Sequence, residues 1–221
     1  MVEQHSTDYI SSLRRNYTQS QLRRSSLHED PFEQFKKWFN QTLETKEIEP
    51  NAMVLGTTNG NKPSSRTVLL KSFNSNGFIF FTNYKSRKAQ EILDNENVSL
   101  LFPWYSIERQ VMILGKAMKI SKSESYNYFK SRPRNSQISA WVSQQSQIID
   151  SREELLKKLE IITREFCNIE IQLPIDWGGF LVKPFEFEFW QGRENRLHDR
   201  FRYSLGENST NKSWLIDRLS P

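Results

Sequence analysis

The sequence predicts a mainly β protein of the α+β class, with a β-barrel core and a few peripheral helices. Aromatic residues, which favour strands, make up 13% of the 221 residues. Short apolar runs are separated by turns that contain Asn and Gly. Residues 185–189 alternate strictly between Phe and Glu, which is typical of a strand with one aromatic and one acidic face. Many short antiparallel strands of this kind favour a barrel.

The first helix is predicted to begin at Pro31. Asp30 can cap it, Pro31 suits the first helical position, and Glu33 stands where it would complete a capping box. Residues 1–29 before it are polar and basic, and we interpret them as an arm that is partly mobile. We expect residues 30–221 to form one domain. The apolar stripe of the first helix is predicted to be Phe32, Phe35, Phe39 and Leu43.

The remaining elements follow from apolar runs and turn residues. Asn59-Gly60-Asn61 and residues 74–77 are turn signals, and the Asn-Gly-containing loop between two extended runs indicates a hairpin. Helices are expected at 86–93, 121–130 and 151–166, and Ser121 and Glu124 have capping-box spacing. Strands are expected at residues 52–58, 65–73, 78–82, 98–102, 110–120, 185–189, 198–203 and 213–219.

Composition narrows the classes of function. The formal net charge of +5 is compatible with nucleic acid, with a small anionic ligand or with an ordinary solvated surface. The charges are spread along the chain and match no nucleic-acid-binding motif, so we do not expect nucleic acid. No Gly-x-Gly-x-x-Gly and no Walker loop is present, which argues against a Rossmann or P-loop nucleotide site.

The single cysteine, Cys167, allows no disulfide within the chain and no zinc site built on cysteines. We expect it to be a small half-buried residue rather than a nucleophile. Three scattered histidines do not suggest a metal cluster, and no metal is expected. The N-terminus has no apolar signal region and no stretch reaches membrane-spanning length, so we expect a cytoplasmic protein without a membrane partner.

Two stretches are candidate phosphate sites. Ser86-Arg87-Lys88 begins a predicted helix, where cations oppose the helix dipole unless an anion lies between them. The alternative is a solvated helix end. Tyr128 and Arg132 share a helix face, and Ser136 follows Pro133, so they could bind a second phosphate. Surface polarity at a helix end explains that pattern equally well.

Other polar stretches are less specific. Arg66 and Lys71 bracket an apolar strand and are predicted to lie on opposite faces, where both could simply leave the sheet. If the stretch 196–200 is extended, Arg196, His198 and Arg200 point one way. Their repulsion favours a ligand over a salt-bridged barrel rim. Trp190 and Gln191 would offer a stacking surface, and Gln145-Ser146 in a loop is weak evidence alone.

Long runs of these residues resemble the pyridoxine/pyridoxamine 5′-phosphate oxidase family over roughly residues 10 to 221. The most specific are Glu188-Phe189-Trp190-Gln191-Gly192 and Arg196-Leu197-His198-Asp199-Arg200-Phe201. The other matching segments are Ser65-Arg66-Thr67-Val68-Leu69-Leu70-Lys71, Ser86-Arg87-Lys88-Ala89, Leu101-Phe102-Pro103-Trp104, Glu108-Arg109-Gln110-Val111, Tyr128-Phe129-Lys130-Ser131-Arg132-Pro133-Arg134, Ala140-Trp141-Val142-Ser143, Trp177-Gly178-Gly179 and Asp217-Arg218-Leu219-Ser220-Pro221.

The resemblance implies an FMN-binding split β-barrel and a homodimer with two flavins at the subunit interface. FMN contacts are then expected at Arg66, Thr67, Val68, Leu69, Leu70, Lys71, Phe81, Thr82, Arg87, Lys88, Gln110, Gln145, Ser146, Trp190 and Arg200. Substrate contacts are expected at Arg14, Tyr17, Lys71, Tyr128, Arg132, Ser136, Arg196 and His198, of which Arg196 and His198 are the candidate catalytic residues. Phe81 stands where the family commonly has tyrosine, so any hydroxyl bond there is lost.

The implied activity is oxidation of pyridoxine and pyridoxamine 5′-phosphate to pyridoxal 5′-phosphate, in vitamin B6 salvage and biosynthesis. Oxygen would reoxidise the flavin and give hydrogen peroxide, and the amine would also release ammonia. Phosphate groups on FMN and on the substrate would explain two separate cationic clusters. The alternatives are another FMN-binding split-barrel protein such as a reductase, and a non-enzymatic module that binds pyridoxal phosphate or nucleic acid.

Overall fold

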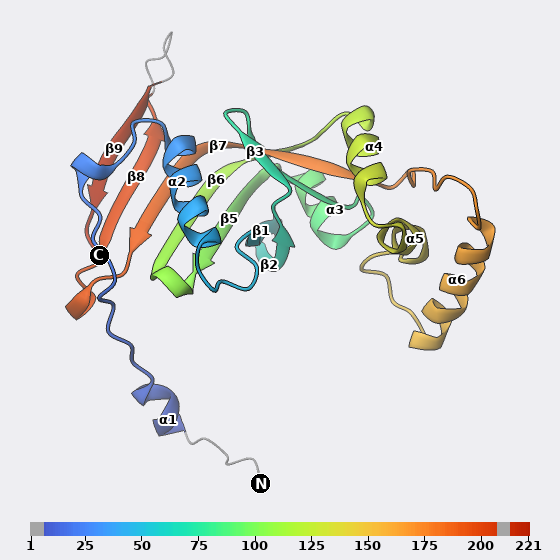
Figure 1. Ribbon diagram of the computed structural model, residues 1–221, viewed down its shortest axis with the longest axis horizontal. Helices are drawn as coiled ribbons and strands as arrows, with labels where there is room; N and C mark the ends of the chain where they lie inside the picture. Colours follow the sequence, from blue (N-terminus) through green and yellow to red (C-terminus); the bar gives the residue numbers. More distant parts are fainter. Residues whose placement is uncertain (1–6, 207–212) are drawn as a thin grey trace. The chain divides into compact units, whose positions relative to one another are not determined.

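The computed structural model describes residues 7–206 and 213–221 (Figure 1). The chain divides into two compact units. Unit 1 contains the described residues up to 50, Pro103–Val111, and the described residues from Phe187 onward. Unit 2 contains Asn51–Phe102 and Met112–Glu186. Residues 1–6 of the expected arm lie outside the described residues. The division into an arm and one domain stays a prediction.

Strands dominate the described chain, and the predicted α+β class is confirmed. The sheet order is β2-β1-β5-β6-β7-β4-β3, with β8 pairing with both β7 and β9. The strands are β1 (Ala52–Asn59), β2 (Lys62–Leu69), β3 (Ser72–Asn74), β4 (Gly77–Asn83), β5 (Asn97–Trp104), β6 (Arg109–Lys119), β7 (Trp177–Gln191), β8 (Asp199–Leu205) and β9 (Trp214–Leu219).

The helices flank these strands in the sequence. The α-helices are α1 (Thr7–Ser12), α2 (Pro31–Leu43), α3 (Arg87–Asp94), α4 (Lys122–Ser131), α5 (Arg134–Val142) and α6 (Arg152–Glu165). Three short 3-10 helices are η1 (Arg24–Ser26), η2 (Tyr105–Ile107) and η3 (Glu194–Arg196). None of the helices in the described part of the chain is long and apolar enough to cross a membrane.

In unit 1, α2 packs its aromatic face against strand residues. Phe35 lies 5.6 Å from Trp104 and Trp38 lies 5.2 Å from Phe189, measured between ring centroids. The Asp30 carboxylate accepts from the Phe32 amide, as predicted for the cap. Two details of the helix prediction are wrong. Glu33 pairs with Lys36 instead of completing a capping box, and Leu43 is 56% exposed because it lies in the last turn, beyond the packed face.

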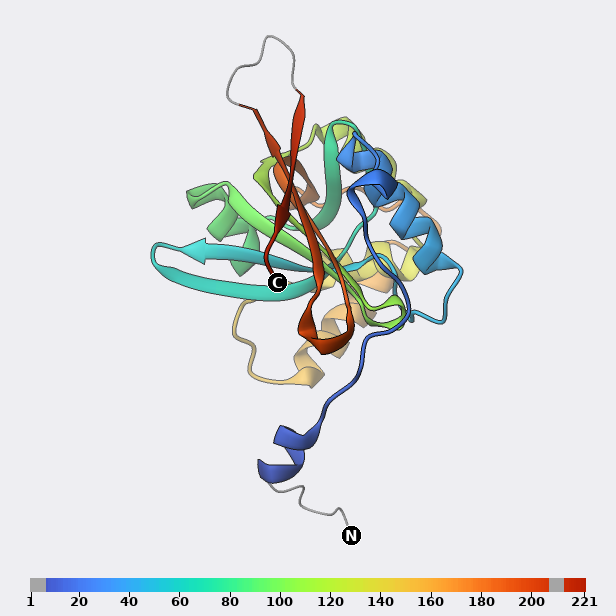
Figure 2. The ribbon, with the colours of Figure 1, turned by 90° about the vertical axis from the view of Figure 1, so that its left-hand side faces the viewer.

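The β8–β9 hairpin of unit 1 is easiest to follow in Figure 2. Strand β7, which β8 pairs with, was predicted only at residues 185–189 but runs for 15 residues. Gly178, Gly179 and Pro184 hid its first half, because glycine and proline are depleted in strands. The prediction of one aromatic and one acidic face is wrong in part, since Glu188 is buried and Phe185 is 39% exposed.

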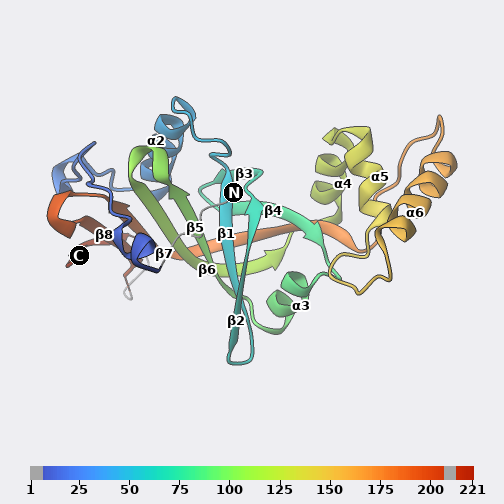
Figure 3. The ribbon, with the colours of Figure 1, turned by 90° about the horizontal axis from the view of Figure 1, so that it is seen from below.

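In unit 2, β1 and β2 form the long hairpin visible in Figure 3, with Asn59 opposite Lys62. Helices α4, α5 and α6 gather in the same unit around a small apolar cluster of Phe129, Ile138, Val142, Ile171 and Trp177. Helix α5 was not predicted. It follows α4 with only Arg132 and Pro133 between them, and it is anchored by two buried apolar side chains rather than by a regular stripe.

Cys167 is exposed, so the expectation of a half-buried cysteine is wrong. It lies just past the end of α6, none of whose residues is buried. Among residues 7–206 and 213–221, no group of three or more His, Cys, Asp or Glu side chains could hold a metal ion.

Two hairpin glycines of unit 2 provide a matched test of how closely the backbone of a neighbouring strand approaches them. Gly60 has φ of 54° with open space around it, whereas a Cβ on Gly77 (φ 144°) would lie 2.2 Å from the Val182 carbonyl oxygen. We expect Gly60→Ala to lower the free energy of unfolding by about 1 kcal/mol, the cost of left-handed backbone alone. Gly77→Ala should lower it by about 3 kcal/mol or more, because a backbone clash adds to the strain. Urea denaturation measures both, and equal losses would contradict this account.

Candidate functional site

Three cations of unit 2, Arg66, Arg87 and Lys88, gather at the start of α3. The Lys88 ammonium donates to Gln145 Oε1 at 2.9 Å and lies 3.3 Å from Thr82 Oγ1. The Arg87 backbone amide donates to Ser146 Oγ at 3.2 Å. Ser86 is the N-cap residue, but its side chain makes no capping hydrogen bond. The first turn of α3 therefore combines cations, hydroxyl groups and an amide in one place.

Positive charge is in excess in this first cluster, which we define as Arg66, Arg87, Lys88 and Glu91. Arg66 is 3.1 Å from Glu91 Oε2, and Arg87 is 2.8 Å from Glu91 Oε1. Burial lowers the pKa of Lys88, the charge of Arg66 lowers it further, and Glu91 only partly opposes them. Three cations thus face one carboxylate, and an anion at this helix N-terminus would relieve their repulsion.

A cavity of about 340 Å³ in unit 2 contains a second group of predicted site residues. Lys71, Phe81, Thr82, Tyr128, Arg132 and Gln145 are among its lining residues. Tyr128 stacks on Phe81 with ring centroids 3.8 Å apart. The guanidinium of Arg132 lies 4.7 Å from the Trp177 ring centroid. Thr82 and Gln145 also belong to the surroundings of the first cluster, so one cavity reaches both groups.

The buried nitrogen Nη1 of Arg132 has no hydrogen-bond partner among residues 7–206 and 213–221. Burial also lowers the pKa of this guanidinium, although the group stays a cation at neutral pH. A buried charged donor without an acceptor is costly, so the position favours an anionic ligand. Burial raises the pKa of the neighbouring Tyr128, which keeps its phenol protonated as a donor.

The remaining unit 2 candidates lie on β2, directly after it, or in α5. Arg66, Thr67, Val68 and Leu69 lie on β2, and the buried Leu70 and the exposed Lys71 follow it. Ser136 is half-buried in the first turn of α5, and the residues that line the cavity of about 340 Å³ do not include it. Whether these residues contact a ligand stays a prediction.

In unit 1, a cavity of about 690 Å³ is lined by Arg14, Tyr17, Arg193, Arg196 and His198, among others. Tyr17 meets Trp190 edge-on at 5.7 Å and His198 at 5.7 Å, between ring centroids. Trp190 and His198 are 4.7 Å apart. The structure therefore brings four of the predicted residues, Arg14, Tyr17, Arg196 and His198, to one cavity and Trp190 next to it.

The arm residues are held against this cavity by specific contacts. A Cβ on Gly192 would lie 2.7 Å from Tyr17 Cγ, so only glycine leaves room for that ring. Glu108, whose side chain is 1% exposed, accepts from the Gln19 amide at 3.0 Å and pairs with Arg15 at 3.4 Å. The Gln110 side chain that follows on β6 is half-buried.

His198 has a defined hydrogen-bonding state. Its Nδ1 accepts from the Arg193 amide at 3.1 Å, which leaves the proton of the neutral ring on Nε2. Burial lowers the pKa of His198, and the charge of Arg196 lowers it further. The imidazole is therefore neutral at pH 7, with Nε2–H as its one ring donor.

The prediction that Arg196, His198 and Arg200 share one face of an extended stretch is wrong. Arg196 lies in η3, where Asn195 and Arg196 have φ of 56° and 61°, and the strand begins only at Asp199. Arg200 is engaged elsewhere: it pairs with Glu188 through Nε at 2.8 Å and Nη2 at 3.1 Å, and its Nη1 donates to the Ser220 carbonyl. An FMN contact at Arg200 stays a prediction.

Three buried carboxylates, Glu91, Glu108 and Glu188, were not among the predicted site residues. Glu91 and Glu188 neutralise the arginines named above, and Glu108 holds the arm. Only Glu91 left a local signal, because it follows Arg87 at the i, i+4 spacing of a helical ion pair. The other pairings join residues far apart in the sequence, and no spacing rule predicts them.

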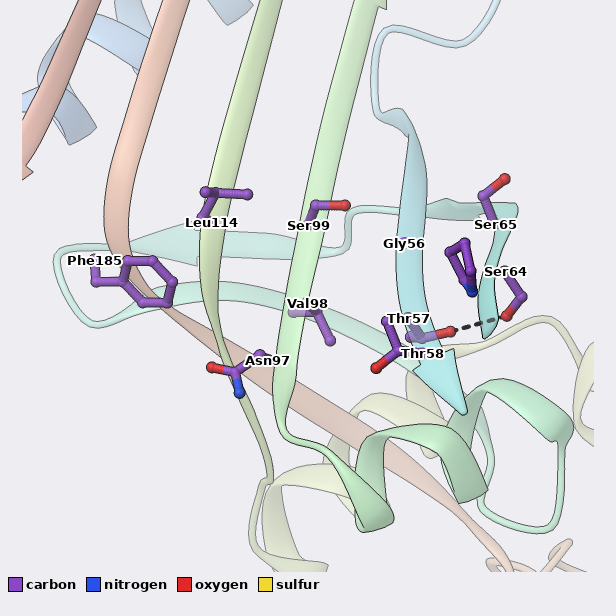
Figure 4. A pocket seen from close by; sticks show the side chains of 11 residues that line it. Gly56, Thr57, Thr58, Ser64, Ser65, Asn97, Val98, Ser99, Leu114 and Phe185 are labelled. Carbon is purple, nitrogen blue, oxygen red and sulfur yellow. Dashed lines mark hydrogen bonds between the residues drawn. The ribbon is translucent and has the colours of Figure 1, made fainter. Parts of the chain in front are cut away.

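Another cavity of unit 2, of about 550 Å³, has no charged side chain among its lining residues. It is shown in Figure 4, where Thr57 and Ser64 of the β1–β2 hairpin point toward each other. Their hydroxyl oxygens are 3.2 Å apart, and both also hydrogen-bond to Glu91. No lysine or arginine lines this cavity, so it does not share the excess of positive charge found in the first cluster.

Relatives with similar sequences cover nearly the whole chain. The chain is 56% identical over 213 residues to a pyridoxine/pyridoxamine 5′-phosphate oxidase of Prochlorococcus marinus (strain MIT 9303), covering 96% of each. It is 51% identical to the enzyme of that name from Aliarcobacter butzleri (strain RM4018), covering 96% of this chain and 99% of the relative.

Solved structures show the same fold. The structure of PhzG from Burkholderia lata 383, in complex with tetrahydrophenazine-1-carboxylic acid, has a TM-score of 0.83 at 27% identity and covers 89% of this chain and 95% of PhzG. A pyridoxamine 5′-phosphate oxidase-related, FMN-binding protein from Nostoc punctiforme has a TM-score of 0.67 at 14% identity, covering 85% of this chain and 97% of that one. The predicted split-barrel fold is confirmed by these likenesses.

Two family models account for most of the sequence. The model described as pyridoxamine 5′-phosphate oxidase matches residues 39–163. The model described as the pyridoxine 5′-phosphate oxidase C-terminal dimerisation region matches residues 177–221. Together with the relatives above, these matches show that the chain belongs to the pyridoxine/pyridoxamine 5′-phosphate oxidase family.

Proposed function

We propose that this protein is an FMN-dependent oxidase that converts pyridoxine and pyridoxamine 5′-phosphate into pyridoxal 5′-phosphate. The observation that supports it best is the unpartnered buried Nη1 of Arg132, in a cavity that also reaches Thr82 and Gln145 of the first cluster's surroundings. Two neighbouring anion sites suit an enzyme whose cofactor and substrate each carry a phosphate. The names of the relatives support the same activity.

The first cluster would hold the phosphate of FMN. Arg66, Arg87 and Lys88 supply the positive charge, and Gln145 and Ser146 lie within hydrogen-bond distance of the cluster. Charge-assisted hydrogen bonds to a phosphate are stronger than neutral ones, so this cluster should dominate cofactor affinity. The residues from Thr67 to Lys71, with Phe81, Thr82, Gln110, Trp190 and Arg200, are proposed to contact the rest of the cofactor.

The second cluster, which we define as Lys71, Tyr128 and Arg132, would hold the phosphate of the substrate. Arg132 offers its unpaired Nη1, Tyr128 offers a protonated phenol, and Lys71 lines the same cavity. Ser136 completes the proposed set. Because Tyr128 is stacked on Phe81 and Arg132 lies over Trp177, both donors are held in place before the ligand arrives, which lowers the entropy lost on binding.

Arg14, Tyr17, Arg196 and His198 would contact and orient the substrate ring, with Nε2–H of the neutral His198 as a donor. When bound, FMN supplies the hydride acceptor for oxidation at the 4′ carbon of the substrate. We propose oxygen as the final acceptor, with hydrogen peroxide as by-product and ammonia released from the amine. Orientation of the ring is the part of the catalysis that these side chains provide.

The match to a C-terminal dimerisation region supports a homodimer, and we propose that FMN lies at the interface between the two copies. We also propose that the enzyme acts in the cytoplasm in the formation of pyridoxal 5′-phosphate. The alternative is another FMN-binding split-barrel enzyme, such as a reductase. The structure of PhzG holds tetrahydrophenazine-1-carboxylic acid, which carries no phosphate, whereas the buried Arg132 beside Tyr128 favours a phosphorylated substrate for this chain.

The direct test is a visible absorbance scan of the FMN-loaded protein without oxygen, before and after addition of pyridoxine 5′-phosphate. We expect the flavin band to bleach and to return when air is admitted. Unphosphorylated pyridoxine at the same concentration is the control and should bleach the band far more slowly. A band that stays unchanged with pyridoxine 5′-phosphate would contradict the substrate assignment and favour the reductase.

Arg132→Met tests the substrate phosphate site while keeping the length of the side chain. We expect kcat/KM for pyridoxine 5′-phosphate to fall about 100-fold, since one or two hydrogen bonds to a charged group are lost at about 1.5–3 kcal/mol each. Lys130→Met is the matched control, because Lys130 is an exposed neighbour whose side chain contacts, among the described residues, only Glu170 and Tyr126. Steady-state kinetics measure both variants. Equal kinetics in the two would show that Arg132 does not bind substrate.

Gly192→Ala tests the placement of the arm. The added methyl group would displace Tyr17, so we expect KM for the substrate to rise about tenfold through lost positioning. FMN affinity should change little. Gly206→Ala is the control in the same unit, since a Cβ on Gly206 would lie 3.8 Å from its nearest neighbour, Leu215 Cδ1. A KM for Gly192→Ala equal to that of the control would mean that Tyr17 is not held over the substrate.

A further inference from the structure

We propose that Glu91 is a positioning residue of the cofactor site, which orients Arg87 toward the phosphate of FMN and holds the charge of Arg66 beside it. The inference rests on the proposed function, because it assigns a further residue to the phosphate site described there. Glu91 lies on the buried face of α3, one turn after Arg87, and is 3% exposed.

Both carboxylate oxygens of Glu91 are occupied, and each serves a different arginine. Oε2 accepts from Thr57 Oγ1 at 2.5 Å, Ser64 Oγ at 2.6 Å and Arg66 Nη2 at 3.1 Å. Oε1 accepts from Arg87 Nε at 2.8 Å. The carboxylate thus connects the β1–β2 hairpin, which carries Thr57, Ser64 and Arg66, to the N-terminal turn of α3.

Glu91 binds the Nε edge of the Arg87 guanidinium and leaves its two terminal nitrogens exposed to a ligand. Glu91 binds Nε, and the two terminal nitrogens of Arg87 have no partner among the described residues. Those nitrogens carry donors in a planar fork that matches two oxygens of a phosphate. A carboxylate on Nε therefore fixes the guanidinium plane while it leaves the terminal donors for an anion.

Glu91 remains charged under all ordinary conditions. Burial raises the pKa of its carboxyl group, but hydrogen bonds from Ser64, Thr57 and Arg87 and the charge of Arg66 outweigh it and lower the pKa to about 2. A permanent negative charge beside a phosphate would by itself weaken phosphate binding. If Glu91 acts through geometry, its removal must weaken FMN binding, the opposite of what charge alone predicts.

The experiment compares FMN with riboflavin, which has the same ring system without the phosphate. Dissociation constants are measured by quenching of flavin fluorescence on the full-length protein stripped of flavin. The variants are Glu91→Ala and the milder Glu91→Gln, which keeps one acceptor oxygen but loses the charge. Glu96→Gln is the matched control, because Glu96 is exposed and its carboxylate pairs with Lys116 alone in the part of the chain that the structure describes. Urea denaturation reports on the stability of each variant.

We expect Glu91→Ala to raise the dissociation constant for FMN about tenfold, roughly one charge-assisted contact, and that for riboflavin less than about twofold. Glu91→Gln should raise the constant for FMN by about threefold, so this variant carries the test if Glu91→Ala does not fold. Glu96→Gln should match the wild type with both flavins.

Two outcomes would overturn the inference while FMN still binds the wild-type protein. Equal weakening of FMN and riboflavin would mean that Glu91 merely supports the fold of the hairpin and α3. Unchanged or tighter FMN binding would mean that its charge, not its geometry, acts on the phosphate. A wild-type protein that binds neither flavin would instead contradict the proposed function itself, and with it the role of Glu91.

Discussion

The repulsion between cations held at the start of α3 is the constraint on which the site in unit 2 depends. Lys88 is partly buried beside Arg66, and both burial and that neighbouring charge lower its pKa. At about 4 Å, two like charges near a protein surface repel by roughly 4 kcal/mol at an effective dielectric constant of 20. A fold can keep these cations together only if a negative charge offsets their repulsion. The carboxylate of Glu91 offsets part of it. The rest is available to an anionic ligand.

Unit 2 holds its two clusters of positive charge by different physical means. In the first cluster, a buried carboxylate with four hydrogen-bond donors fixes two arginines. In the second cluster, aromatic rings hold the side chains in place: Trp177 lies under Arg132, and Phe81 stacks on Tyr128. A ring face attracts a cation without using up its N–H groups. Arg132 therefore keeps a free donor that a carboxylate partner would have occupied.

The sequence predicted those elements whose signals are local. The Asp30 cap and the Ser121–Glu124 capping box depend on residues two or three apart, and both are present. Helix α5 and the first half of β7 were missed because packing, not local pattern, stabilises them. The candidate residues themselves came mostly from a family resemblance, and the structure gathers many of them into two cavities. Their carboxylate partners could not be predicted, since Glu91 meets Thr57 across 34 residues and Glu108 meets Gln19 across 89.

Backbone strain in the described chain is concentrated in the segments that carry or adjoin the candidate site residues. Among residues 7–206 and 213–221, five residues other than glycine have positive φ, and four of them belong to the site regions: Glu108, Ser146, Asn195 and Arg196. Each such residue costs about 1 kcal/mol or more, which a fold retains only when the surroundings demand it. At Arg196 the reason for the strain is visible. An extended backbone would have placed the Arg196 side chain on the same face as those of His198 and Arg200. The left-handed turn at η3 instead brings Arg196 to the cavity with His198, while Arg200 is left to pair with Glu188. The local strain thus separates an arginine that faces a ligand cavity from one that stabilises the sheet.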